Sequence, residues 1–335
     1  MNDQAIIFCQ APIETAQVLY IYEKIKPQYK NIIIACLRTK SYIDFFKYMK
    51  LEVQYIYIPE FIFSIKHILG NIKKISEIKH YAQTININES DIYFTSRFDE
   101  QLAFLLVYKK NNNKSYYIYD KDTIWKLSNK YKMTLKQKLY DWYLKTITKA
   151  KLERFPTSES NALYNIPVEK MSNCQIIYNK IDSDFFKKHS YKIPNNITER
   201  TVIFYSEPYR FDFTSQDSYY EMNKRIVDSL HHKGYKVALK GHPRIGVPDN
   251  VMNMVDYIIP AFIPAEFINL KDFTFAIGFV STSLSDALRE IPSYSVLKMC
   301  PIQNINNYNH FSSFLSELSS NKIKFIENFN EIPNA

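Results

Sequence analysis

The stretch KGHPR combines residue types that can bind and protonate a phosphate. It follows the apolar run KVALK and contains Lys240, Gly241, His242, Pro243 and Arg244. Gly241 permits close approach of the backbone, and Pro243 fixes the turn. The histidine could bind a phosphate as an imidazolium or protonate it as a general acid when it departs. The alternative interpretation is a solvated basic strand end.

A hydroxyl cluster lies further along, in IGFVSTSLSDAL, where an apolar strand ends at Gly278 and a helix is expected to begin. The cluster consists of Ser281, Thr282 and Ser283. Backbone N–H groups at a helix N-terminus, together with hydroxyl donors, make a site suited to phosphate. The simpler interpretation is an ordinary helix cap, because Ser and Thr are the usual capping residues.

Glu266, in IPAFIPAEF, lies between these two stretches at the expected start of a helix. A carboxylate there can accept hydrogen bonds from the two hydroxyl groups of a ribose, as in dinucleotide-binding folds. A carboxylate that stabilises the helix dipole is the alternative.

Acidic residues end an apolar strand in the first half of the chain, in YYIYDKDTIW. Asp120 or Asp122 could take the proton from an attacking hydroxyl, which is the role of a general base. Asp residues are also common in turns at strand ends. Asp99 and Glu100, in SRFDEQLAF, are weaker candidates for the same role.

The elements that must position these residues are alternating apolar strands and amphipathic helices. Expected strands of the first half cover residues 5–10, 31–37, 53–58, 91–96 and 115–120, with helices over 15–25 and 41–49. Expected strands of the second half cover residues 201–208, 235–243, 255–260 and 273–279, with helices over 218–234, 265–272 and from about 281. This alternation predicts parallel sheets covered by helices on both faces.

The length of 335 residues suits two domains. The stretch KIPNNITER, residues 192–200, is the expected linker, so we predict an N-terminal Rossmann-like domain over 1–190 and a C-terminal one over 198–335. Ligands of such folds bind at the carboxyl ends of the strands. The candidate chemistry is therefore expected in a cleft between two doubly wound α/β domains.

Composition restricts the function classes. The formal charge of +9 suits polyanions without choosing among them, and the basic residues carry no nucleic-acid motif. The four scattered cysteines predict neither a zinc site nor a disulfide framework, and there is no clustered carboxylate site, so we expect no metal. The N-terminus lacks the pattern of a signal peptide, which favours the cytoplasm.

The order KGHP, IPAFIPAEFI and GFVSTSL resembles the bacterial sialyltransferases of the GT-B fold, over roughly residues 200–300. That family shares an acidic element, a His-Pro element and a paired Ser/Thr element. The resemblance implies inverting, metal-independent transfer of sialic acid, or a related nonulosonic acid, from its CMP-activated form. The acceptor would be a hydroxyl of a cell-surface glycan, such as lipooligosaccharide or capsule, and no further cofactor is implied.

The resemblance also implies residue roles. His242 matches the histidine that assists departure of the CMP phosphate, and Glu266 matches the carboxylate that holds the ribose. Thr282 and Ser283 match the phosphate-binding hydroxyl pair, with Ser281 possible in a shifted alignment. Asp120 matches the general base, but Lys121 and Asp122 replace the second acid and the glycine of the family, so Asp122 stays an alternative.

Two rival functions stay open. One is a GT-B glycosyltransferase that uses a UDP- or GDP-sugar, because the same fold serves any nucleotide sugar. The other is a non-catalytic protein that binds polyanions or an anionic membrane surface.

A basic amphipathic helix is expected over residues 130–155. It could lie on an anionic membrane face where glycolipid acceptors reside, or be a solvated helix with an aromatic core face. A peripheral location at the inner membrane face is therefore an alternative to a purely cytoplasmic one. The oligomeric state is open, with a homodimer among the alternatives.

Overall fold

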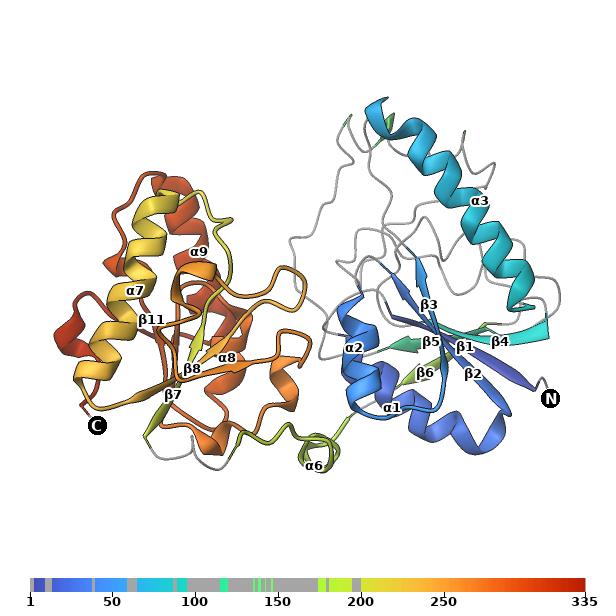
Figure 1. The fold of residues 1–335 in the computed structure, drawn as a ribbon, viewed down its shortest axis with the longest axis horizontal. Coiled ribbons are helices and arrows are strands. Elements are labelled where there is room, and N and C mark those ends of the chain that lie inside the picture. The colour runs from blue at the N-terminus through green and yellow to red at the C-terminus, as the bar shows by residue number, and fades with distance from the viewer. Residues whose placement is uncertain are drawn as a thin grey trace. The chain divides into compact units, whose positions relative to one another are not determined.

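The computed structural model describes residues 3–9, 14–37, 40–58, 65–86, 89–94, 115–119, 135, 138–139, 142, 146, 174–178, 181–194 and 200–334. The chain divides into two compact units, residues 1–182 and 183–335. The ribbon of each unit is shown in Figure 1.

The first unit is built on a parallel sheet with the strand order β3-β2-β1-β4-β5-β6. The strands are β1 (Gln4–Cys9), β2 (Asn31–Leu37), β3 (Gln54–Ile58), β4 (Ser90–Phe94), β5 (Ser115–Tyr119) and β6 (Cys174–Tyr178). The helices are α1 (Thr15–Ile25), α2 (Ser41–Tyr48) and α3 (Ile68–Thr84), with short 3₁₀ turns at Lys26–Gln28 and Ile65–His67. Because parallel crossovers are right-handed, the reversal of strand order after β3 places helices on both faces of the sheet.

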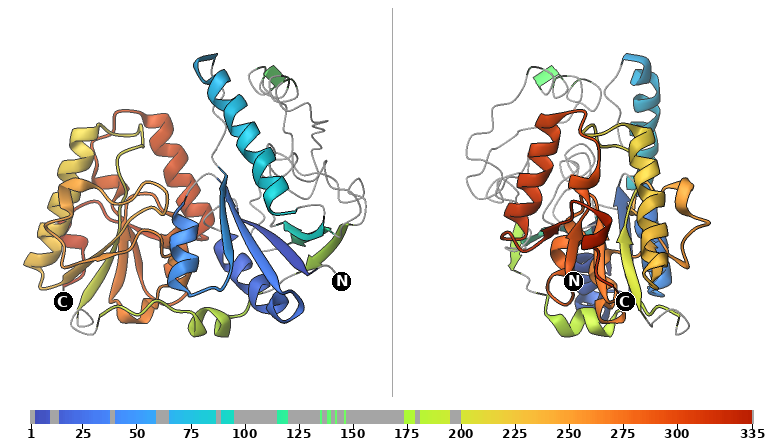
Figure 2. Two further views of the ribbon diagram at one scale, coloured as in Figure 1. Left: turned by 45° about the vertical axis from the view of Figure 1, so that its right-hand side comes forward. Right: turned by 90° about the vertical axis from the view of Figure 1, so that its left-hand side faces the viewer.

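The second unit repeats this topology, with the strand order β12-β11-β10-β7-β8-β9. The strands are β7 (Thr201–Tyr205), β8 (Lys236–Lys240), β9 (Tyr257–Ile259), β10 (Phe275–Gly278), β11 (Ser293–Ser295) and β12 (Lys324–Phe325). The helices are α6 (Ser183–Lys188), α7 (Gln216–His232), α8 (Thr282–Ala287) and α9 (Ile305–Leu318). The 3₁₀ turns are η8 (Asp249–Val251), η9 (Ala265–Phe267), η10 (Leu270–Asp272), η11 (Leu297–Met299) and η12 (Phe329–Glu331). Figure 2 shows α7 and α9 on opposite faces of the sheet.

Both units are thus Rossmann-like, doubly wound α/β domains. Every strand pair in the described sheets is parallel, as the near-continuous apolar runs predict. Two such domains in tandem are the architecture of the GT-B class, so the fold class expected from the sequence is confirmed.

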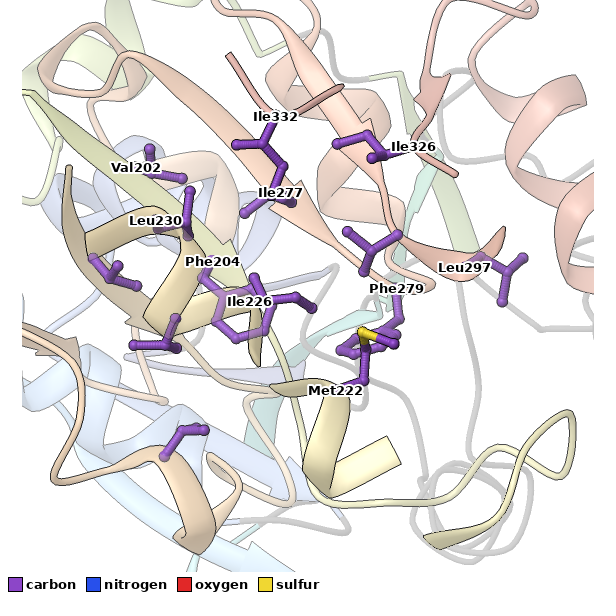
Figure 3. Packing of buried hydrophobic residues seen from close by; sticks show 14 of the residues in the cluster. Val202, Phe204, Met222, Ile226, Leu230, Ile277, Phe279, Leu297, Ile326 and Ile332 are labelled. Carbon is purple, nitrogen blue, oxygen red and sulfur yellow. The ribbon is translucent and has the colours of Figure 1, made fainter. Parts of the chain in front are cut away.

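The core of the C-terminal domain is fully buried between β7, β10 and α7 (Figure 3). Helix α7 contributes Met222, Ile226 and Leu230, which recur at helical spacing and pack on the strands. Its end is also as expected: Gly234 adopts φ +81°, the left-handed conformation that terminates many helices. The amphipathic pattern of this segment therefore predicted both the helix and its packing face.

The prediction of a helix over residues 265–272 is wrong. This segment forms the two 3₁₀ turns η9 and η10, separated by extended backbone at Ile268, where ψ is 129°. Ile268 pairs as a β-bridge with Tyr191, whose N–H donates to the carbonyl of Phe267 at 2.6 Å. This pairing with a residue distant in sequence outweighs the local helical pattern.

The boundary of the two compact units precedes the stretch expected as the linker. Helix α6 belongs to the second unit, because the rings of Phe185 and Phe186 pack on Phe267 with centroid distances of 6.4 and 5.4 Å. The stretch 192–200 consequently follows a segment that is already attached to the C-terminal domain.

Gly278 can be tested as a position where the sheet accepts no side chain. A Cβ atom there would lie 2.7 Å from the carbonyl oxygen of Tyr205 on the neighbouring strand β7. We expect Gly278→Ala to destabilise the C-terminal domain by about 1–3 kcal/mol, because the backbone of β7 cannot move aside for the methyl group without disturbing the sheet. Hydrogen exchange of peptides from β7 and β10 should accelerate. The exposed Glu290→Ala should leave this exchange unchanged, and equal exchange in both variants would contradict the packing argument.

Candidate functional site

The candidate site lies at the carboxyl ends of three neighbouring strands in the C-terminal domain. The register aligns Lys240 of β8 with Tyr205 of β7, and Tyr205 with Gly278 of β10. Neighbouring strands lie about 4.8 Å apart, so the segments after β8 and β10 begin roughly 10 Å apart. Strand β7 lies between them at the point where the strand order reverses. This switch point is where doubly wound folds bind ligands.

His242 is held in a tight turn that directly follows β8. Its backbone N–H donates to the carbonyl of Gly246 at 2.9 Å, and Gly246 returns a bond of 2.8 Å to the carbonyl of His242. Gly246 has φ +83°, which favours glycine. A Cβ atom on Gly241 would lie 2.3 Å from the carbonyl oxygen of Gly246. Gly241 therefore serves the closure of this turn, which is a reason for glycine that needs no ligand.

The ring of His242 is oriented by its own turn. The backbone N–H of Arg244 donates to Nδ1 of His242 at 3.1 Å. Because a backbone N–H can only donate, Nδ1 is the acceptor, and the proton of the neutral ring is on Nε2. The half-buried imidazole therefore has an Nε2–H donor for a ligand.

The pKa of His242 is lowered to about 4, first by burial and then by Arg210, Arg244 and Lys240. The ligand-free protein thus holds His242 neutral at pH 7. The imidazolium expected from the sequence would form only if a bound anion offset these neighbouring cations. In the free state, hydrogen-bond donation from Nε2 is the chemistry that the ring offers.

Lys240 is buried, and its ammonium group lies inside the domain. Its Nζ donates to the carbonyl oxygens of Gly241, at 2.6 Å, and Ala261, at 3.2 Å. Burial lowers its pKa to about 8, against the attraction of Glu266. The expected donor-binding lysine therefore joins the segments after β8 and β9 and contributes its positive charge from inside the domain.

Glu266 lies in η9 and is half-buried, where the sequence predicted the start of a longer helix. Burial raises its pKa to about 7, and Asp286 adds to the rise, while its own backbone N–H and Lys240 oppose it. Burial raises the pKa of Tyr205, and the carboxylates of Asp286 and Glu266 add to the rise. Lys240, Tyr205, Glu266 and Asp286 thus form one electrostatic cluster around the end of β7.

The three hydroxyl residues before α8 differ in what they do. Ser281 is the N-cap, and its side chain accepts from the N–H of Ser283 at 3.2 Å, which is the ordinary capping interpretation. Thr282 is exposed and Ser283 is half-buried. The helix has only six residues. Its dipole is therefore small, and any anion binding at this point would rest mainly on the hydroxyls of Thr282 and Ser283.

Sequence reasoning missed the segment after β7. Glu207 is buried, and its Oε1 accepts from a guanidinium nitrogen of Arg210 at 2.9 Å. The pKa of Glu207 is raised by burial, although the charge of Arg210 acts in the opposite direction. The position of SEPYR directly after an apolar strand at the switch point was the signal that could have identified these residues.

Several expected residues lie outside the part of the chain that the structure describes. Asp120 and Asp122, the alternative general bases, are among them, although β5 ends at Tyr119. Asp99 and Glu100 also lie outside it. The assignment of the base therefore stays a prediction.

The expected helix over 130–155 is described at five residues, all of them helical: Leu135, Lys138, Leu139, Trp142 and Thr146. The apolar side chains of Leu135 and Trp142 are exposed by 73% and 66%. At these positions the apolar residues therefore do not form an aromatic core face.

The described residues offer neither a metal-binding cluster nor a membrane-crossing helix. Within those residues, no group of three or more His, Cys, Asp or Glu side chains is arranged to hold a metal ion. Among the described helices, none has the length and apolar character needed to cross a membrane.

Similarity of this chain to known proteins is found among solved structures. No family model matches the chain, and no curated protein matches it. Similar structures include the UDP-GlcNAc 2-epimerase of Methanocaldococcus jannaschii in complex with UDP-GlcNAc and UDP, at 11% identity and TM-score 0.49, covering 98% of this chain and 90% of that one. MurG of Acinetobacter baumannii has 9% identity and TM-score 0.38, covering 97% and 86%.

A third similar structure is the E. coli heptosyltransferase WaaC with ADP-2-deoxy-2-fluoro heptose, at 12% identity and TM-score 0.38, covering 87% of this chain and 88% of that one. None of these three is named as a sialyltransferase. At such low identities and scores the similarity carries no statement about substrate.

The neutral state of His242 gives a direct test of the site. In the free protein, NMR of labelled histidine should show His242 titrating near pH 4, well below an ordinary histidine. Saturating inorganic phosphate should raise this pKa, because a bound anion offsets Arg210, Arg244 and Lys240. His231 is the control, because its Nε2 pairs with the carboxylate of Asp256. Its signals should not move when phosphate is added. An ordinary pKa for His242 in the free protein would contradict the description.

Proposed function

We propose that the protein is a glycosyltransferase that takes its sugar from a nucleotide-activated donor, bound by the C-terminal domain. The observation that carries this proposal is the Nε2–H of His242, oriented by Arg244 and surrounded by cations at the switch point of a doubly wound sheet. A donor phosphate there would supply the negative charge that these cations favour.

The proposed role of the site is to stabilise the departing nucleotide. The acceptor hydroxyl attacks the anomeric carbon, the glycosidic bond to phosphate breaks, and the phosphate gains negative charge. Donation from Nε2 of His242, and from the hydroxyls of Thr282 and Ser283, would strengthen as this charge develops. A carboxylate of the N-terminal domain, Asp120 or Asp122, would accept the proton of the hydroxyl.

Glu266 is proposed to hold the ribose of the nucleotide. Its carboxylate interacts electrostatically with Asp286 and Lys240, and η9 contacts α8, the helix that begins at Thr282. The ionised form accepts hydrogen bonds from both ribose hydroxyls, whereas the neutral form accepts them less strongly. With a pKa of about 7 in the free protein, this carboxylate should favour ribose binding above that pH.

Two donor classes are candidates. The order of the His-Pro, Glu266 and Ser/Thr elements supports a CMP-activated sialic or related nonulosonic acid, transferred with inversion to a glycan hydroxyl and without a metal. The concentration of Lys240, Arg210 and Arg244 around His242 supports the alternative, a nucleoside-diphosphate sugar such as a UDP- or GDP-sugar, which brings more negative charge. Both are nucleotide-sugar donors, and the nucleotide that stabilises the protein distinguishes them.

The acceptor is proposed to be an oligosaccharide or a glycolipid. The exposed apolar residues Leu135, Leu139 and Trp142, with basic residues around them in the sequence, support contact with an anionic membrane surface, where lipid-linked acceptors reside. A location at the inner face of the cytoplasmic membrane is proposed on this basis.

Removal of the imidazole should abolish most of the transfer. We expect His242→Ala to lower the rate at least ~10²-fold, because one positioned donor to the leaving group contributes about that factor. The measurement is turnover of labelled nucleotide sugar, with thermal unfolding as the check that the fold is retained. His310→Ala, on α9, is the matched control and should retain its rate. Wild-type turnover by His242→Ala would refute the assigned role.

Thermal stabilisation by nucleotides should separate the donor classes. A ligand present at 100 times its Kd stabilises the folded state by about 2.7 kcal/mol, which a melting experiment detects readily. Stabilisation by CMP but not by UDP or GDP would support a CMP-activated donor. The reverse result would support a nucleoside-diphosphate sugar, and no stabilisation by any nucleotide would contradict the proposed function.

A further inference from the structure

The segment after β7, residues 206–210, presents an arginine beside the candidate phosphate site. We call it the β7 exit loop. Glu207 in this loop is buried, with 10% of its side chain exposed, whereas the side chain of Arg210 is 51% exposed. The two are joined by a hydrogen-bonded ion pair of 2.9 Å between Oε1 and a terminal guanidinium nitrogen. A buried carboxylate thus anchors a cation that extends to the surface.

The anchor itself is fixed by buried hydrogen bonds. The hydroxyl of Tyr219, on α7, donates to the carbonyl of Glu207 at 2.9 Å. The N–H of Ser206 donates to the carbonyl of Lys240 at 3.2 Å, which ties the loop to the end of β8. The β7 exit loop therefore begins directly beside the turn that holds His242, and its backbone cannot easily move away.

The guanidinium of Arg210 is oriented on two sides. Glu207 holds one terminal nitrogen, and the ring of Phe211 lies under the guanidinium carbon at 5.1 Å from its centroid. An arginine offers five N–H donors in a planar fork, so further donors are available for a ligand. This fork matches the two oxygens of a carboxylate or a phosphate group.

Arg210 lies close enough to His242 to influence its ring electrostatically. Its charge contributes to holding His242 neutral, and its effect is larger than that of Arg244, although Arg244 lies in the same turn as the ring. The phosphate that accepts from Nε2 of His242 would therefore lie close to Arg210 as well. A donor with a second anionic group adjacent to that phosphate would place this group within reach of the fork.

We propose that Arg210 binds a second anionic group of the donor, next to the phosphate at His242, and that Glu207 is the residue that positions it. This inference rests on the proposed function, because it presupposes a nucleotide sugar at that site. The group is either the second phosphate of a nucleoside-diphosphate sugar or the carboxylate of a CMP-activated nonulosonic acid. Both present two oxygens to the guanidinium.

The test compares ligands that differ by the second anionic group. Calorimetry measures Kd for UMP and UDP, and for CMP and CMP-N-acetylneuraminic acid, with wild-type protein, Arg210→Ala and Arg225→Ala. Arg225 is an exposed cation of α7 that stacks on Phe329, so its removal controls for net charge and should leave every Kd unchanged.

We expect Arg210→Ala to weaken the binding of one two-anion ligand at least ~10-fold, the usual scale for losing a charged hydrogen bond. The matching monophosphate should lose less than about threefold. Selective loss for UDP identifies a second phosphate, and selective loss for CMP-N-acetylneuraminic acid identifies a carboxylate. Either result supports the proposal.

The role of Glu207 has its own readout. Glu207→Gln keeps the size of the side chain but removes the charge that holds the guanidinium, so it should reproduce part of the same selective loss. A uniform loss across all four ligands would instead indicate general damage to the domain and contradict a positioning role. Thermal unfolding of each variant reports whether the domain is folded.

Three results separate the possible failures. Equal losses for mono- and two-anion ligands in Arg210→Ala, or no loss for any ligand, overturn the inference while leaving the proposed function standing. If Arg210→Ala does not fold, Arg210→Lys replaces it, since lysine keeps the charge but lacks the fork; wild-type binding of all ligands by Arg210→Lys overturns the inference. A wild-type protein that binds none of the four overturns the proposed function, and this inference with it.

Discussion

The alignment of three strand ends determines the candidate site. Lys240, Tyr205 and Gly278 lie in one row across β8, β7 and β10, and the polar segments that follow them emerge at a single edge of the sheet. This row depends on close packing: Gly278 leaves no space beside the carbonyl of Tyr205 for even a methyl group. A sheet with this register brings together His242, Glu266 and Arg210, which are distant in sequence. The electrostatics of the site follow from their proximity.

Positive charge dominates at the imidazole. Of the charged groups in the described part of the chain, those with the largest effect on His242 are all cationic. Glu207 pairs with Arg210, and Glu266 interacts electrostatically with Asp286 and Lys240. Below the ordinary pKa of histidine this arrangement costs stability, because the unfolded chain binds a proton that the folded domain resists, and a bound anion would offset that cost. Functional sites commonly combine such locally unfavourable features with a rigid surrounding core.

The sequence predicted the architecture well because parallel sheets produce strong local signals. Buried strands such as β2 are runs of Ile and other apolar residues, and helices such as α7 carry an apolar stripe at the helical period. It failed over residues 265–272, where pairing of Ile268 with Tyr191 replaces the expected helix. The compact units divide before α6, and the packing of Phe185 on Phe267 that attaches α6 to the second unit is a long-range contact with no local signal.

The sequence indicates the residue types that gather at the candidate site, but not their protonation states or hydrogen bonds. His242, Glu266 and Thr282 were identified from their positions after apolar strands, but the neutral tautomer of His242 depends on a bond from the backbone of Arg244. The capping role of Ser281 could be anticipated, whereas the interior position of Lys240 could not. Glu207 and Arg210 were overlooked because a short polar stretch after a strand resembles an ordinary turn.

The central claim is that the carboxyl edge of the sheet after β7, β8 and β10 holds the phosphate of a nucleotide. A crystal structure of the protein soaked with a nucleotide tests it most directly. The account predicts a phosphate oxygen about 2.7–3.1 Å from Nε2 of His242, with the ribose near Glu266. A nucleotide bound elsewhere on the protein, with no phosphate density at His242, would contradict it.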